Sequence, residues 1–315
     1  MEQEFSFNPL LDALNSRLAN VEAALLEQRK ITQDIQELVR QVRQLVGPFA
    51  VPVSPDELLV QTLFGVKFYV PARDQLITPQ LVVYRQWEAQ LSRLLPRLAP
   101  AGSVFVDIGA NFGYFTCLVA TGMKATPGSR VIAVEPNPEM LRLLEINTRI
   151  NWSMAPVRVV AAALADKRGT RLLHVPANAA GNATLVATDG ESRGTASAPA
   201  EKMTTVEVEV LRLDDVLRNE AKLDLIKVDV EGFETAVFRG GSETLQRPGL
   251  KIVFEWAQGQ TRAAGFQPAT ILEMLRQYGY RLFDAESYLD AAAPLELTDE
   301  ALLATPYANV LALRD

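Results

Sequence analysis

The fold of this chain is decided by the stretch Val104–Thr116, which reads VFVDIGANFGYFT. Its apolar start is typical of a buried strand, and the glycines that follow lead into a helix whose apolar stripe reaches Val119. A parallel strand that enters a helix through glycines leaves backbone N–H groups free and lets a nucleotide approach the main chain. We therefore predict an open α/β sheet with Asp107 at its ligand edge.

The spacing of the glycines separates two nucleotide cofactors. A dinucleotide turn needs the pattern G-x-G-x-x-G, which rests a pyrophosphate on the helix N-terminus. Here Asn111 stands between Gly109 and Gly113, where a second glycine would be needed, so a pyrophosphate is disfavoured. The turn suits an uncharged nucleoside with a zwitterionic tail, whose ammonium group Asp107 would bind. S-adenosylmethionine has this shape.

The next predicted strand ends in an acid at the same edge of the sheet. Residues 130–138 read RVIAVEPNP, so Glu135 closes the strand, and Pro136 and Asn137 break it before a new helix. An acidic residue at the end of the second strand accepts the two ribose hydroxyls of an adenosine. Glu135 and the glycine turn together predict an adenosine-bearing cofactor.

Four motifs follow one another along the chain. They read VDIGANFGY at 106–114, VEPNP at 134–138, LDDVL at 213–217 and IKVDVEGFE at 226–234. As an ordered set, they resemble the FkbM-type methyltransferases, from about Phe64 to the C-terminus. The resemblance implies a class I methyltransferase, an α/β fold that is Rossmann-like, with a seven-stranded, mostly parallel sheet and helices on both faces. It also implies S-adenosylmethionine as cofactor and hydroxyl groups of sugars, glycans or polyketides as acceptors.

Cofactor contacts are expected from the turns at this edge. In the resembled fold the third strand, here Val157–Ala163, ends beside the adenine. Asp166 has an alternative role, because aspartate commonly caps a turn such as Asp166–Gly169. The expected cofactor-binding residues are Asp107, Gly109, Asn111, Phe112, Gly113, Tyr114, Glu135, Pro136, Asn137, Ala163, Leu164, Asp166 and Asp229.

A further charged strand end is expected to carry the chemistry. Residues 224–232 read DLIKVDVEG, an apolar strand interrupted by charges that need partners when buried. Strand alternation places Lys227 and Asp229 on one side. An alcohol loses its proton as it attacks the sulfonium methyl group, so Asp229 and Glu231 are candidate bases, and Lys227 would hold the base or the acceptor oxygen. The alternative is a Lys227–Asp229 ion pair that only fixes the site.

Three other side chains have both functional and structural interpretations. His174, the single histidine, would suit a base near neutral pH, although a packed or surface histidine is the ordinary case on a two-faced strand. Glu255 ends the following strand and would bind Mg²⁺ together with Asp229 and Glu231. We predict a site without metal, because acids on one sheet edge indicate metal weakly. Cys117 is expected to be an inert core thiol.

Residues 1–46 are predicted to form one amphipathic coiled-coil helix that joins copies of the chain into a homo-oligomer. Apolar residues recur at spacings of three and four, with no internal glycine or proline. At about 1.5 Å per residue such a helix is about 55 Å long, too long to lie wholly on one small domain. The alternative is a helix folded back on its own core. The two seam positions hold Leu11, Leu18, Leu25, Thr32, Val39 and Val46, and Leu14, Val21, Gln28, Ile35 and Val42.

Residues 47–100 are expected to form a linker, a small hairpin and a helix that lead into the catalytic domain at 101–315. Residues 63–71 indicate strands around a turn, and Tyr84–Leu91 indicates a helix. The resemblance implies that Trp87 and Glu88 lie near the mouth of the active site. The alternative for Trp87 is a packing anchor, and Glu88 is expected on a solvated face.

The second half of the chain is expected to complete the sheet. Residues 171–175 and 206–210 alternate like an antiparallel pair, and the long segment Ala187–Met203 between them is predicted to be a mobile lid. Strands at 280–283 and 308–313 would complete the seven-stranded sheet of the resembled class.

Composition excludes several partners. The net charge is −7, and no run of lysine and arginine interleaved with aromatic residues occurs, so nucleic acid is not expected. A single cysteine excludes an internal disulfide framework and a cysteine-based zinc site. No stretch approaches the ~18 apolar residues of a membrane span, and no secretory leader is evident, so a cytoplasmic location is expected.

Three functions are weighed on these residues. The first is an S-adenosylmethionine-dependent O-methyltransferase that acts on a hydroxyl of a sugar, glycan or related natural product. The second is an NAD-dependent oxidoreductase, against which the missing G-x-G-x-x-G pattern argues. The third is a coiled-coil scaffold with a cofactor-binding but inactive domain, against which the intact Asp107, Gly109, Glu135 and Asp229 argue.

Overall fold

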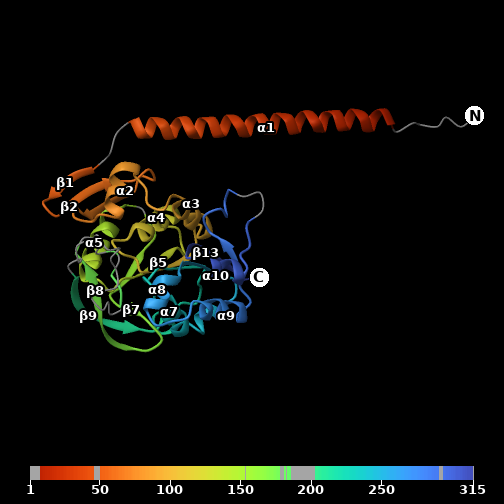
Figure 1. The fold of residues 1–315 in the computed structure, drawn as a ribbon. Coiled ribbons are helices and arrows are strands. Elements are labelled where there is room, and N and C mark those ends of the chain that lie inside the picture. Colours follow the sequence, from red (N-terminus) through yellow and green to blue (C-terminus); the bar gives the residue numbers. More distant parts are fainter. Residues whose placement is uncertain are drawn as a thin grey trace, which may run out of the picture. The chain divides into compact units, whose positions relative to one another are not determined.

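The structure is a computed structural model that describes residues 8–45, 50–152, 154–177, 181, 183–185, 203–290 and 294–314. The chain divides into two compact units, residues 1–48 and 49–315. The first unit contains the helix α1, and the second contains every strand drawn in Figure 1. The two units are described separately below.

The first unit is one uninterrupted helix, α1 (Asn8–Leu45), of 38 residues. This confirms the long N-terminal helix that the sequence predicts. Polar Thr32 at the predicted seam donates its hydroxyl to the carbonyl of Gln28 at 2.8 Å, so both polar seam residues belong to one turn of the helix. The described apolar seam side chains are all exposed, and they are Leu14, Leu18, Val21, Leu25, Ile35, Val39 and Val42.

The second unit is organised by a seven-stranded sheet. Its strand order is β12-β13-β11-β10-β4-β5-β6. Neighbouring strands from β11 to β6 are parallel, whereas β13 is antiparallel to both β11 and β12. This is the mostly parallel sheet expected of the resembled class. Its strands are β4 (Val104–Ile108), β5 (Arg130–Val134), β6 (Val157–Val160), β10 (Leu225–Val228), β11 (Lys251–Ala257), β12 (Arg281–Asp284) and β13 (Tyr307–Leu313).

Alternation along the central strand builds a core on each face of the sheet. Phe105 packs into one hydrophobic cluster, and its neighbours Val104 and Val106 pack into another, because successive side chains of a strand point to opposite faces. Helices lie on both faces of the sheet (Figure 1). The first cluster includes residues of α3 (Ala89–Leu98), α4 (Tyr114–Met123) and α5 (Pro138–Ile150), and the second includes residues of α6 (Leu213–Val216), α7 (Glu234–Gly240), α9 (Ala269–Gln277) and α10 (Asp299–Ala304).

The segment before the main sheet differs from its prediction at one point. A helix through Tyr84–Leu91 is wrong, because α2 (Ile77–Tyr84) ends there and α3 starts only at Ala89. Arg85 and Glu88 have left-handed backbone angles, with φ of 58° and 40°, and the Trp87 N–H donates to the Tyr114 hydroxyl at 3.0 Å. The break therefore ties the chain to α4. Before it, β1 (Ala50–Ser54), β2 (Glu57–Gln61) and β3 (Lys67–Pro71) form an antiparallel sheet.

A third, small sheet stands beside the main one. The predicted antiparallel pair is confirmed as β8 (Gly169–Pro176) and β9 (Met203–Leu211). The predicted strand Val157–Ala163 is wrong at its end, because the Ala162 N–H bonds to the Val160 carbonyl at 3.1 Å and turns the chain. β7 (Ala163–Leu164) then pairs with β9 instead. Of the predicted lid, residues 187–202 lie outside the described residues. No helix within the described ranges is long and apolar enough to cross a membrane.

Candidate active site

The glycine turn brings the tips of β4 and β10 into direct contact. A Cβ atom on Gly109 would lie 1.8 Å from the carbonyl oxygen of Asp229, so no side chain fits at this position. Gly109 also has a φ of 78°, and its N–H and that of Ala110 donate to the Val134 carbonyl at 3.0 Å. The turn is therefore held by the strands on both sides of it.

Glu135 lies at the tip of β5 and is held by backbone donors. Its side chain is buried, and its two carboxyl oxygens accept the N–H groups of Asn111 and Asn137, both at 2.8 Å. Burial raises the pKa of Glu135 to about 7, and the two N–H groups oppose that rise. A carboxylate offers about four lone-pair sites, so each oxygen keeps acceptor capacity for a ligand hydroxyl.

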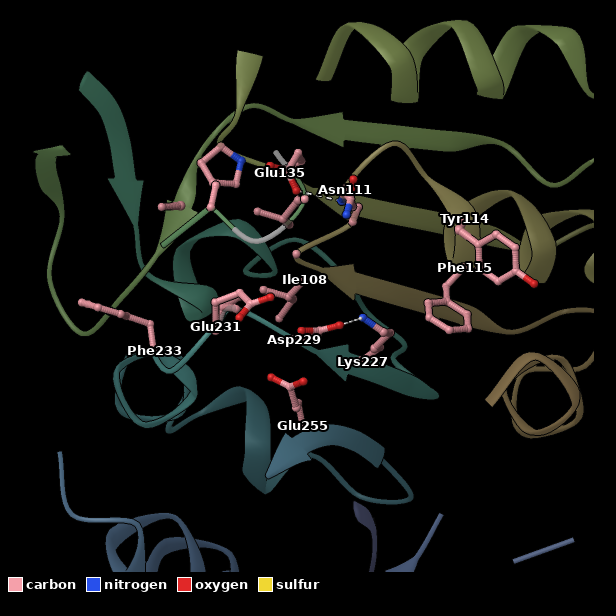
Figure 2. A pocket seen from close by; sticks show the side chains of 18 of the residues that line it. Ile108, Asn111, Tyr114, Phe115, Glu135, Lys227, Asp229, Glu231, Phe233 and Glu255 are labelled. Atoms are coloured by element: carbon pink, nitrogen blue, oxygen red, sulfur yellow. Dashed lines mark hydrogen bonds and ion pairs between the residues drawn. The ribbon is translucent and has the colours of Figure 1, made fainter. Parts of the chain in front are cut away.

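Lys227 and Asp229 form an ion pair on the other side of the cavity. The Lys227 Nζ atom lies 2.9 Å from the Asp229 carboxylate, as the dashed line in Figure 2 marks. Burial lowers the pKa of Lys227, but the charges of Asp229, Asp107 and Glu88 outweigh it and raise that pKa above its usual value. Lys227 also lies over the Phe115 ring. These neighbouring charges therefore favour the protonated, cationic form of Lys227.

Asp107 supports this ion pair from below. It pairs in register with Lys227 across β4 and β10, is buried, and accepts the Thr116 hydroxyl at 2.6 Å. Burial raises the pKa of Asp107. The Asp107 side chain is not part of the cavity lining. It therefore lies beneath the residues that line the cavity, although the sequence predicts that it binds the ammonium group of the cofactor.

A buried glutamate shapes the loop that carries the candidate bases. Glu234 is fully buried, and its Oε1 atom accepts the N–H groups of Val230 at 3.1 Å and Gly232 at 3.3 Å. Between them Glu231 has a φ of 54°, and its carboxylate accepts a hydrogen bond from the Gln260 amide. The sequence analysis does not single out Glu234, although it is the last residue of the fourth motif and follows Gly232 and Phe233.

Two further carboxyl groups lie at this side of the cavity. Glu88, expected on a solvated face, instead lines the cavity, because the break between α2 and α3 turns it inward; that prediction is wrong. Burial and the charge of Asp229 raise the pKa of Glu88 to about 7 and that of Glu255 to about 10. Trp87 lines the same cavity, as the resemblance implies.

The cavity has a volume of about 230 Å³ and gathers most of the predicted residues. Figure 2 shows Glu135 and Asn111 on one side and Asp229, Glu231 and Glu255 on the other. Glu255, Gln260 and Tyr307 also line it. The predicted residues in the lining are Gly109, Asn111, Phe112, Tyr114, Glu135, Pro136, Ala163, Leu164, Lys227, Asp229 and Glu231. Those outside it are Asp107, Gly113, Asn137, Asp166 and His174.

The residues outside the lining have structural surroundings. The backbone of His174 in β8 exchanges N–H and C=O bonds with Thr184. The Asn137 side chain caps α5 by accepting the Glu139 N–H at 3.1 Å. Cys117 is buried, as expected of a core thiol, and burial raises its pKa. Within the described residues, no group of three or more histidine, cysteine, aspartate or glutamate side chains is arranged to hold a metal ion.

This sheet order, with a glycine turn and an acid at the tips of adjacent strands, defines a class I methyltransferase fold. A family model described as the methyltransferase FkbM domain matches residues 107–282, and the chain belongs to that family. It carries an S-adenosylmethionine-dependent methyltransferase domain, so the oxidoreductase alternative is not supported. The spare acceptor sites of Glu135 and the close approach at Gly109 fit this cofactor.

Named methyltransferases are among its relatives. Methyltransferase sdnD of Sordaria araneosa is 31% identical over 164 residues, which cover 46% of this chain and 62% of that protein. Hexuronic acid methyltransferase AglP of Haloferax volcanii is 29% identical over 169 residues, 53% of this chain and 61% of the other. 2-O-methyltransferase NoeI of Sinorhizobium fredii is 28% identical over 211 residues, 64% of this chain and 79% of the other. The chain thus spans only about six tenths of the first two relatives.

Solved structures of similar proteins are more distant. A methyltransferase FkbM from Methylobacillus flagellatus is 15% identical with a TM-score of 0.39, covering 68% of this chain and 44% of the other. An S-adenosylmethionine-dependent O-methyltransferase from Thermotoga maritima is 15% identical with a TM-score of 0.40, covering 81% and 77%.

Proposed function

We propose that the protein transfers the methyl group of S-adenosylmethionine to a hydroxyl group of a saccharide acceptor. The observation that carries the proposal is the Asp229 carboxylate, which lines the cavity beside the glycine turn and is fixed by Lys227 at 2.9 Å. Two relatives are named for a hexuronic acid acceptor and for 2-O-methylation, which supports an oxygen acceptor on a sugar.

Each residue has a defined task in this proposal. Bound S-adenosylmethionine supplies an electrophilic methyl group. Glu135 would accept the ribose hydroxyls, since its oxygens have acceptor capacity beyond the N–H groups of Asn111 and Asn137. Asp229 would take the proton of the attacking hydroxyl, and Lys227, whose Nζ atom lies 2.9 Å from the Asp229 carboxylate, would hold that carboxylate in position. Aligning the acceptor and excluding water account for much of the remaining rate enhancement.

Asp229 is the better candidate for the base than Glu231. Both line the cavity, but the Asp229 side chain is 30% exposed there, whereas the Glu231 carboxylate is already engaged by Gln260. His174 lies outside the lining, which argues against its use as a base. Glu231 remains the second candidate.

The test is mass spectrometry of products after a panel of saccharides is incubated with the protein and S-adenosylmethionine. We expect the mass of one added methyl group on a neutral hydroxyl, with formation of S-adenosylhomocysteine. An inactive cofactor-binding scaffold would instead raise the melting temperature with S-adenosylmethionine and methylate nothing. Such a result across the panel would overturn the proposal.

We also propose that α1 joins copies of the chain into a homo-oligomer. The apolar side chains of the predicted seam are 43% to 59% exposed, a range in which they remain free to pack on a partner helix. Burying such a stripe against an identical one removes apolar surface from water along the whole helix. A cytoplasmic location stays a prediction from the sequence.

The oligomer is tested with two matched pairs of substitutions. Leu18→Lys with Leu25→Lys changes two seam positions, and Ala19→Lys with Leu26→Lys changes the adjacent, off-seam positions by the same charge. Light scattering should give a lower assembly mass for the first pair and an unchanged mass for the second. Equal masses for the unaltered chain and both double variants would reject the coiled-coil interpretation.

A further inference from the structure

One wall of the cavity leaves polar atoms without hydrogen bonds. The Oε2 atoms of Glu88 and Glu255 and the Oε1 atom of Gln260 are buried, and none has a hydrogen-bond partner among the described residues. All three side chains line the cavity. Figure 2 shows Glu255 on the side of Asp229, away from Glu135. The Gln260 amide bonds to Glu231 on that side, and Glu88 is close enough to Asp229 for the charge of Asp229 to raise its pKa. A buried polar atom without a partner costs free energy, so these atoms have the capacity to bind the hydroxyl groups of a ligand.

The same wall is rich in carboxyl groups. Glu88, Asp229, Glu231 and Glu255 all line it, and among the described residues of the lining Lys227 is the one cation, already paired with Asp229. The raised pKa values of Glu88, about 7, and Glu255, about 10, have burial as their first cause and the neighbouring charge of Asp229 as their second. A further negative charge would meet the same low dielectric and the same repulsion.

Aromatic rings complete this wall. Trp87 and Tyr307 line it beside the carboxyl groups. Burial, and next the charge of Glu255, raise the pKa of Tyr307. An aromatic ring supplies a large apolar face at little conformational cost, which suits the C–H face of a sugar ring whose hydroxyls meet polar atoms.

We infer that the acceptor is a neutral, polyhydroxylated ring, and that this wall discriminates against acceptors that carry a carboxylate. The inference rests on the proposed function, since it describes the acceptor side of that site. It sets this chain apart from its Haloferax relative, which is named for a hexuronic acid. The hydroxyls of a neutral ring satisfy the unpartnered oxygens, whereas an anionic ring adds a charge for which no free cation exists in the described lining.

The experiment compares matched glycoside pairs that differ only at C6, a hexoside and the corresponding hexuronoside, in the gluco, galacto and manno series. Binding to protein loaded with S-adenosylhomocysteine is measured by calorimetry, and methyl transfer is measured in parallel. We expect the neutral member of a bound pair to be favoured by about 100-fold in affinity and in kcat/KM. Equal or tighter binding of the hexuronoside would overturn the inference.

The two readouts separate this inference from the proposed function. Selective binding of neutral glycosides without methyl transfer supports the neutral-acceptor wall and overturns the transfer reaction. Methyl transfer that favours hexuronosides supports the transfer reaction and overturns the inference of a neutral acceptor. Absence of binding across every pair overturns both.

A matched substitution sharpens the test. Glu88→Gln keeps the shape of the side chain but removes its charge, so preference for the neutral member should fall by about tenfold. Because the pKa of Glu88 is about 7, the preference of the unaltered protein should grow as pH rises through that value, and the variant should lose this growth. The control is Glu300→Gln on the exposed surface of α10, which should change neither. An identical preference in all three proteins at every pH would contradict the role of Glu88.

Discussion

The carboxyl groups on the two sides of the cavity differ in their hydrogen bonding. At the tips of β4 and β5, both oxygens of Glu135 are held by backbone N–H groups at 2.8 Å, and the backbone at Gly109 approaches Asp229 too closely for any side chain. On the other side, Glu255 in β11 and Glu88 in the break between α2 and α3 each keep a buried oxygen without a partner in the described residues. On the first side, the protein itself supplies the hydrogen bonds of the carboxyl group. On the second side, a bound ligand would have to supply the missing hydrogen bonds.

This difference matches the two kinds of molecule that the proposed reaction brings together. A cofactor of fixed structure can be bound by backbone groups whose positions follow from strands and turns. An acceptor is bound by side chains, here supplied by the α2–α3 break, β11 and the start of β13. The comparison predicts that substitutions on the two sides separate cofactor binding from turnover.

The largest effect is expected for Asp229→Asn. The amide cannot take a proton from the acceptor hydroxyl, so kcat should fall by about 100-fold to 10,000-fold, while cofactor affinity changes little. Single-turnover methyl transfer and calorimetry measure the two quantities. The control Glu300→Gln changes an exposed carboxylate on α10 and should keep full turnover.

The same variant tests the structural alternative for the Lys227–Asp229 pair. If the pair only fixes the site, Asp229→Asn should lower the melting temperature while kcat stays within a few-fold of the unaltered protein. That outcome would remove Asp229 as the base and leave Glu231→Gln as the next variant to measure.

The second effect concerns Glu234, which holds the loop on the acceptor side. Burial raises its pKa from 4.5 to about 7, so the folded state binds this proton more tightly than the unfolded state. Its contribution to stability is therefore full below about pH 4.5 and is lost as pH rises through about 7. Relative to Glu234→Gln, the unfolding free energy of the unaltered protein should fall by about 3 kcal/mol across this window.

Urea unfolding of cofactor-free protein at a series of pH values measures this difference. Glutamine does not titrate and keeps the oxygen that accepts the N–H groups of Val230 and Gly232. Glu300→Gln is the exposed control and should follow the unaltered protein at every pH. If the unfolding free energy of the unaltered protein instead rose with pH relative to that of Glu234→Gln, the two N–H groups would outweigh burial, contrary to the raised pKa of Glu234.

The strand ends could be predicted from the sequence because parallel strands bring their carboxyl ends to one edge. Glu135 and Asp229 were placed correctly at the cavity by an apolar run that ends in an acid. Asp107 follows the same pattern, yet it lies behind the lining, since strand alternation turns its side chain toward Lys227 and Thr116.

The acceptor side could not be predicted in the same way. Glu88 reaches the cavity through a left-handed backbone angle that depends on a bond between the Trp87 N–H and the Tyr114 hydroxyl, 27 residues further on. Tyr307 arrives only because β13 pairs with β11, opposite Ala257. Local periodicity contains neither relationship, since both are set by tertiary contacts.

The smallest effect, and the one that isolates the cofactor side, is expected for Glu135→Ala. Losing a carboxylate that would accept the ribose hydroxyls should weaken S-adenosylmethionine binding by about 10-fold to 100-fold, because a hydrogen bond to a charged group contributes roughly 1.5–3 kcal/mol. Glu88→Ala, on the opposite side of the cavity, is the matched control and should leave cofactor affinity within a few-fold. Calorimetric titration with S-adenosylmethionine measures both. Similar losses in the two variants would mean that the sides are not independent, and the cofactor would then have to contact both of them.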